Sequence, residues 1–88
     1  MSSRKRYPMV EVEWDDSCTR GRWDTVERYI ESGVARIKSV GYLVHKDRRG
    51  LMLIQSVDCT PGDDEKMSDS ITIPIGCVRR VRRIRGKG

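Results

Sequence analysis

Residues 70–85 constrain the fold more than any other part of the chain. Isoleucine recurs at every second position over 71–75, which is typical of a half-buried β-strand. Pro74 and Gly76 then predict a tight turn, and a second strand is expected over 78–85. Two short strands joined this closely indicate a small, strongly curved antiparallel sheet.

The earlier part of the chain supplies three more strands. Alternating apolar and acidic residues predict a first strand over 9–14. A long strand is expected over 35–46, with Gly41 marking a bulge or a bend. The return strand over 51–57 is apolar on both faces in its first half, so we expect it to be central. Residues 58–69 are polar and acidic and predict a mobile loop.

Residues 23–33 carry the one helical pattern. Asp24 and Glu27 form a pair that resembles a capping box, and Gly33 suits a C-terminal cap. The predicted helix has only about two turns and is too short to be stable alone. We therefore expect it to pack on the sheet through Trp23, Val26 and Ile30. The chain has no phenylalanine, so its larger aromatic residues are expected in the core, namely Trp14, Trp23 and Tyr42.

These elements predict a mainly β protein: a small five-stranded, strongly bent antiparallel barrel with one short helix between its first and second strands. Closing the barrel would hide the sheet edges of so small a chain. The 88 residues are expected to form one domain over 9–85, between a flexible basic arm at 1–8 and a tail at 86–88.

Positive charge is concentrated at the two ends of the chain, whose net charge is +5. The last strand and its continuation carry the main candidate binding residues, Arg79, Arg80, Arg82, Arg83 and Arg85. We expect them to contact RNA or DNA phosphates, with Arg48 and Arg49 of the preceding hairpin turn extending the surface. If no bulge intervenes, Arg80 and Arg82 share one face and the other three share the opposite face.

A second interpretation of the arginines is purely structural. Basic residues on an edge strand prevent sheets from pairing and aggregating. No aromatic residues interleave with these arginines to stack bases, which favours this alternative over nucleic-acid binding. Charged residues at a hairpin tip such as 47–50 are also commonly only solvated.

The remaining reactive residues predict no enzyme, no metal site and no cofactor. A zinc site would have to combine Cys18, Cys59 and Cys77 with His45, yet the chain has no Cys-x-x-Cys pair. His45 has no neighbouring nucleophile or paired carboxylate to support acid–base catalysis. No apolar run approaches the ~20 residues of a membrane span, and no secretory signal pattern is present. We therefore expect a cytoplasmic protein.

Residues 35–85 resemble the Sm-like family of small β-barrels, which are similar in architecture to Src-homology-3 domains. The resemblance rests on three motifs: Gly41-x-Leu43 followed by Asp47, the strand Leu51-x-Leu53, and the spacing from Ile73-Pro74 to Val78, Val81 and Ile84. It implies a barrel closed by two tightly linked strands. The asparagine with which the family holds an RNA base is missing, because the chain contains no asparagine. Ile75-Gly76 also replaces the family's Arg-Gly pair, so the resemblance implies the barrel without the base pocket.

The whole chain also resembles small uncharacterised bacteriophage proteins, in the stretches 10–17, 39–44 and 73–78. This implies a phage origin and the cytoplasm of a bacterial host. We expect a non-enzymatic barrel that binds nucleic acid through its last strand. The alternative is an adaptor that binds a host or phage protein, by strand pairing or through loop 58–69, and has no nucleic-acid activity.

The oligomeric state stays open between a monomer, a dimer and a ring. Sm-like barrels form rings by pairing the fourth strand of one subunit with the fifth strand of the next. In this chain, such pairing would crowd the arginines of 79–85 at every interface. Pro74 also removes one backbone donor there.

Overall fold

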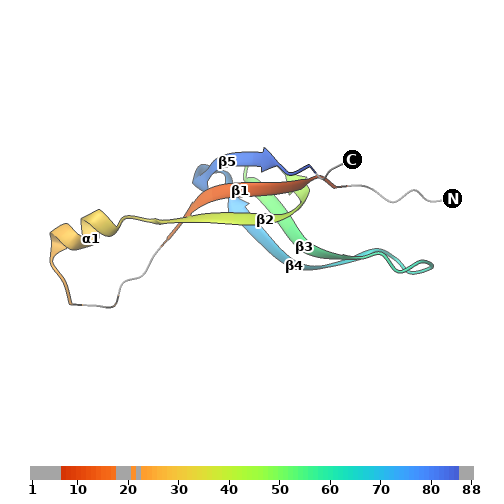
Figure 1. Cartoon of the computed structure of the whole chain (residues 1–88), viewed down its shortest axis with the longest axis horizontal. Coiled ribbons are helices and arrows are strands. Elements are labelled where there is room, and N and C mark those ends of the chain that lie inside the picture. The colour runs from red at the N-terminus through yellow and green to blue at the C-terminus, as the bar shows by residue number, and fades with distance from the viewer. Residues whose placement is uncertain (1–6, 18–20, 22, 86–88) are drawn as a thin grey trace.

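The computed structural model describes residues 7–17, 21 and 23–85. These residues form one five-stranded antiparallel sheet in the order β4-β3-β2-β1-β5 (Figure 1). The elements in chain order are β1 (Met9–Asp16), α1 (Val26–Ser32), β2 (Ala35–Lys46), β3 (Gly50–Asp58), β4 (Lys66–Pro74), the 3-10 turn η1 (Ile75–Cys77) and β5 (Val78–Arg83). The prediction of a mainly β protein with five antiparallel strands and a short helix after the first is confirmed.

The two edge strands, β4 and β5, are consecutive in the chain and are joined by η1. The backbone amide of Ile75 donates to the carbonyl of Arg49 at 2.8 Å, which fixes η1 against the hairpin between β2 and β3. No ladder pairs β4 with β5 within the part of the chain that is described. The sheet is therefore bent but not closed, and the predicted barrel closure is not confirmed.

The core lies on one side of the sheet. Its buried cluster comes from β1, β3 and β4 and consists of Val10, Val12, Leu51, Leu53 and Ile73. Trp14 is half-buried against this cluster, and its indole Nε1 donates to Ser39 Oγ at 3.0 Å. We call this side of the sheet the core side and the opposite side the outer side. β3 is central, as expected, because it pairs with both β2 and β4.

β2 pairs with two different strands along its length. Its residues 35–42 pair with β1, whereas its pairing with β3 runs only from Tyr42 to Lys46. At the change of partner, a Cβ on Gly41 would lie 2.9 Å from the carbonyl oxygen of Ile54, closer than side chains normally approach. Glycine is therefore required where β2 bends past β3. The register also shifts between Leu43 and His45.

The molecule is elongated, measuring 62 × 28 × 25 Å. Its radius of gyration is 17.4 Å, against about 12 Å for a compact chain of this length. Figure 1 shows the reason: α1 lies beyond one end of the β1–β2 ribbon, and the β3–β4 hairpin points in another direction. The only ladder between the two ribbons is the short β2–β3 pairing at the centre, beside the buried cluster that both ribbons contribute to.

The helix does not pack on the sheet, so this expectation is wrong. Trp23, Val26 and Ile30 are 103%, 68% and 73% exposed, and no residue of α1 is buried. The cause is non-local: β1 and β2 pair as far as Asp16 and Ala35, and this ribbon holds α1 away from the core. Local capping instead supports the helix, because Thr25 is the N-cap and its Oγ1 accepts from the Arg28 amide at 3.3 Å.

The predicted long loop over 58–69 is also largely wrong. β3 continues to Asp58 and β4 already begins at Lys66, so the connection spans only 59–65. Cross-strand pairs such as Val57 with Met67 extend the hairpin through a polar sequence. Asp69 has a left-handed backbone conformation, with φ of 59°, and the ladder skips the position where it would face Gln55.

Candidate nucleic-acid interface

β5 is an exposed edge strand that pairs only with β1. In an antiparallel pair, residues directly opposite each other place their side chains on the same side. Arg80 and Arg82 lie opposite Glu13 and Glu11, which puts them on the outer side of the sheet. Arg83 lies opposite the buried Val10, at the margin of the core side. The strand thus presents arginine on both of its faces.

A bulge changes the predicted distribution of the arginines. The register between β1 and β5 shifts at Glu13 and Trp14, so that Arg79 has no directly opposite residue. Its guanidinium turns to the outer side, where Nη1 lies 3.1 Å from Asp15 Oδ2. Arg79 therefore joins Arg80 and Arg82, and the expectation for an unbulged strand, which grouped it with Arg83, does not apply.

A row of carboxylates from β1 runs beside these arginines. Arg82 Nη2 lies 3.3 Å from Glu11 Oε2, and on the far side of β1 the Nε of Arg36 lies 3.5 Å from Glu13 Oε2. By register, the outer side of the three strands carries five basic residues around three acidic ones: Arg79, Arg80, Arg82, Arg36 and Lys38 around Glu11, Glu13 and Asp15. These exposed ion pairs contribute little stability, but they compete with phosphate for the same guanidinium groups.

Three arginines of this region have no carboxylate partner among the described residues. They are Arg80, Arg83 and Arg85, and all three are exposed. Glu13, which faces Arg80 across the ladder, is instead in an ion pair with Arg36. Of the five predicted arginines over 79–85, these three are the positive charges most available to a polyanion.

The hairpin tip with Arg48 and Arg49 is shaped by Asp47. Asp47 Oδ1 accepts from the backbone amides of Arg49 at 2.8 Å and Gly50 at 3.2 Å. Its Oδ2 accepts from Nε2 of His45 at 2.9 Å, because a carboxylate can only accept. The Arg48 and Arg49 side chains are exposed and unpaired in the described region. Since η1 binds the Arg49 carbonyl and leads directly into β5, the tip lies beside the beginning of the arginine strand.

The hairpin tip gives the protein an acid-sensitive element. The hydrogen bond from His45 and those from the Arg49 and Gly50 amides lower the pKa of Asp47. A lowered carboxyl pKa contributes stability that is complete above the ordinary value and is lost as the pH falls through the folded value. We expect the urea midpoint to drop on acidification below about pH 4. The Asp47→Asn variant should lack this part of the drop; identical pH profiles for the two proteins would contradict the role of Asp47.

No other chemistry gathers in the described part of the chain. There, no group of three or more His, Cys, Asp or Glu side chains is placed to hold a metal ion. Cys59 and Cys77 are free thiols, and Cys18 lies outside the described residues. None of the described helices has the length and apolar character needed to cross a bilayer.

Sequence reasoning missed the acidic row and the basic residues Arg36 and Lys38. The alternation of 9–14 and 35–40 does indicate that Glu11 and Glu13 share a face, as do Arg36 and Lys38. Which strands are neighbours is not encoded in that alternation, so the ion pairing could not be predicted. No protein-family model, curated protein or solved structure matches this chain.

Proposed function

We propose that this chain is a non-enzymatic module that binds nucleic acid through phosphate contacts made by the arginines of β5. The observation that carries the proposal is the exposed edge position of this strand, with Arg80, Arg83 and Arg85 free of carboxylate partners among the described residues. Arg48 and Arg49 lie at the adjoining hairpin tip and would extend the contact. No base-reading group is involved, so binding should depend weakly on sequence.

The wider interpretation follows the resemblances of the sequence. We propose a variant of the Sm-like barrel with an unpaired seam between β4 and β5, encoded by a phage and acting in the bacterial cytoplasm. The strand order, with β4 and β5 as the two edges, is compatible with this interpretation. The carboxylates of β1 compete with phosphate for the arginines, which would keep the affinity for nucleic acid moderate.

The test is a fluorescence-anisotropy titration of labelled single-stranded RNA and duplex DNA. If the three unpartnered arginines, Arg80, Arg83 and Arg85, contact duplex phosphates, the slope of log affinity against log salt is about −2.7. Affinity then falls roughly 40-fold between 50 and 200 mM salt. Absence of binding at 50 mM salt would refute the proposal and leave the arginines as protection of the edge.

A second candidate function is a protein adaptor, and the observation that favours it is the apolar stripe of α1. Val26 and Ile30 are large, adjacent on the helix and more than two-thirds exposed. An exposed apolar stripe on a helix is a surface that could pack into an apolar groove of a partner protein.

The double variant Val26→Ser, Ile30→Ser tests whether this stripe is a free surface. Because neither side chain is buried, we expect the free energy of unfolding to change by no more than about 0.5 kcal/mol. Val12→Ser is the matched control, since this valine is fully buried and its loss should destabilise the sheet strongly. A loss of more than about 1 kcal/mol in the double variant would mean that α1 packs within the molecule, and would remove the basis of this candidate.

A further inference from the structure

The half of β2 that pairs with β1 has a free edge on its other side. β1 covers residues 35–42 of β2, but β3 leaves β2 after the pair Tyr42–Ile54 and continues beside β4 alone. The edge of β2 over 35–41 that faces away from β1 therefore has no partner strand among the described residues. Unpaired amide and carbonyl groups along such an edge are a template for another extended segment.

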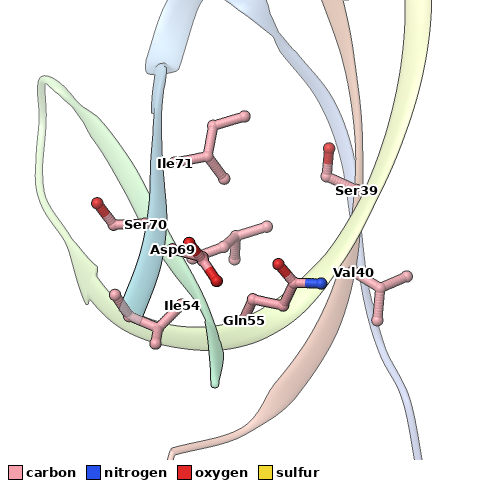
Figure 2. Close-up of a pocket in the computed structure, with 8 residues that line it drawn as sticks. Ser39, Val40, Ile54, Gln55, Asp69, Ser70 and Ile71 are labelled. Carbon is pink, nitrogen blue, oxygen red and sulfur yellow. The ribbon is translucent and has the colours of Figure 1, made fainter. Parts of the chain in front are cut away.

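A hollow of about 450 Å³ adjoins this edge where β2 and β3 diverge. Figure 2 shows Ser39 of β2 and Ile71 of β4 on opposite sides of the hollow, with Asp69 below Ile71 and Gln55 toward the lower end of the hollow. Leu53, which packs in the core, also lines the hollow. Beyond Ile54, β3 no longer lies beside β2. If an extended segment paired with β2 in that position, the hollow would have room for one of its side chains on the core side.

The chemistry of that segment can be deduced from β1, which satisfies the other edge of the same stretch. On the core side, Val12 lies opposite Ser39. On the outer side, Glu13 lies opposite Lys38. A strand on the free edge would meet the same β2 side chains, and Lys38 is exposed with no ion pair among the described residues. We propose that this edge binds an extended segment of a partner protein in which apolar and acidic residues alternate.

A second copy of the chain is a poorer occupant of this edge. In a two-fold antiparallel pairing centred on position 38, each Lys38 would face its own counterpart, and like charges directly opposite each other destabilise a ladder. The arginine-rich β5 is disfavoured for the same reason. Within the described residues, the strand with the required alternation is β1, and both of its edges are already paired. The charge of the edge thus favours a separate, acidic partner.

The first arm of the test measures the affinity of the full-length protein for labelled peptides by anisotropy. The probe has the sequence of residues 9–16, MVEVEWDD, which contains the required pattern. A peptide with the same residues in a non-alternating order, and one in which lysine replaces the four acidic residues, are the controls. We expect the first peptide to bind and both controls to bind at least fivefold more weakly. Equal affinity for all three would overturn the proposal.

The second arm locates the site with two matched charge variants of β2. Lys38→Glu should weaken the acidic peptide about fivefold and strengthen the lysine peptide. Lys46→Glu changes the net charge equally, but Lys46 lies where β3 already occupies the edge, so it should leave both affinities unchanged. Equal effects of the two variants would show that only total charge matters, against the proposal.

Amide hydrogen exchange completes the test. Bound peptide should slow exchange in residues 35–40 while residues 9–16 stay protected. Faster exchange in 9–16 would show that the peptide replaces β1, and would also overturn the proposal. This inference names a protein partner, so it deepens the adaptor candidate of the proposed function. The peptide experiments leave α1 unchanged, so the proposal for the β2 edge and the proposal for the α1 stripe can fail independently.

Discussion

We expect the Gly50→Ala variant to unfold with a free energy about 3 kcal/mol lower than that of the parent protein. Gly50 is buried at the start of β3, where it pairs with Pro74 of β4. A Cβ at this position would overlap the carbonyl oxygen of Ile73 and lie 3.1 Å from its carbonyl carbon. Both obstacles are backbone atoms, so the strain cannot be relieved by moving a flexible side chain. The two strands must separate where the hairpin tip, β4 and η1 meet.

Gly76→Ala is the matched control for this prediction. A Cβ on Gly76 has nothing within 4 Å, and we expect its free energy of unfolding to stay within about 0.5 kcal/mol of the parent. Urea denaturation followed by tryptophan fluorescence measures both variants, with the half-buried Trp14 as the reporter. Equal stability of Gly50→Ala and Gly76→Ala would show that β4 does not approach β3 as closely as described.

The double variant Arg80→Ser, Arg83→Ser should lose about a hundredfold in affinity for duplex DNA at 50 mM salt, taking about 1.4 kcal/mol per lost charged contact. Its salt slope should also be shallower by about 1.8, since two phosphate contacts are removed. These two arginines have no carboxylate to release before they meet a phosphate. The loss should be similar for different sequences, because phosphate contacts carry no sequence information.

Arg79→Ser, Arg82→Ser removes the same charge from the same strand and is the control for this effect. Both of these arginines are in ion pairs with β1 carboxylates, at 3.1 and 3.3 Å. We expect the salt slope to change by less than about 1 in this variant. If both double variants changed the slope equally, total charge and not the unpartnered arginines would govern binding.

Much of the sheet could be predicted because its signals are local. The alternation over 9–14, the turn chemistry at 47–50 and the Pro74–Gly76 interruption each depend on neighbouring residues, and all three are confirmed by the elements observed. The beginning of β4 was not predictable in this way. Residues 66–68 belong to the strand only because 56–58 pair with them, and they have no strong pattern of their own.

The position of the helix and the pairing of the arginines also depend on contacts between distant residues, which local patterns do not reveal. The helical pattern of 23–33 is correct as local structure, although α1 itself spans Val26–Ser32. Its packing was wrong because the paired ends of β1 and β2 decide where the helix lies. The exposed arginines were predictable from composition, whereas their division into paired and unpaired groups depends on the bulge at Arg79 and on the ion pair of Arg36 with Glu13, which leaves Arg80 without a carboxylate. A single extra residue in a ladder changes which side chains meet, and no local pattern reveals it.

The extended outline of the molecule has a consequence for how its mass is judged in solution. A radius of gyration of 17.4 Å is that of a compact domain of about 230 residues, although the chain has 88. A single 10.2 kDa copy should therefore leave a gel-filtration column as early as a globular protein more than twice its weight. Chromatography alone would therefore report a monomer of this shape as a dimer. Light scattering and sedimentation equilibrium measure molecular mass independently of shape, so these methods are the ones that determine the number of subunits.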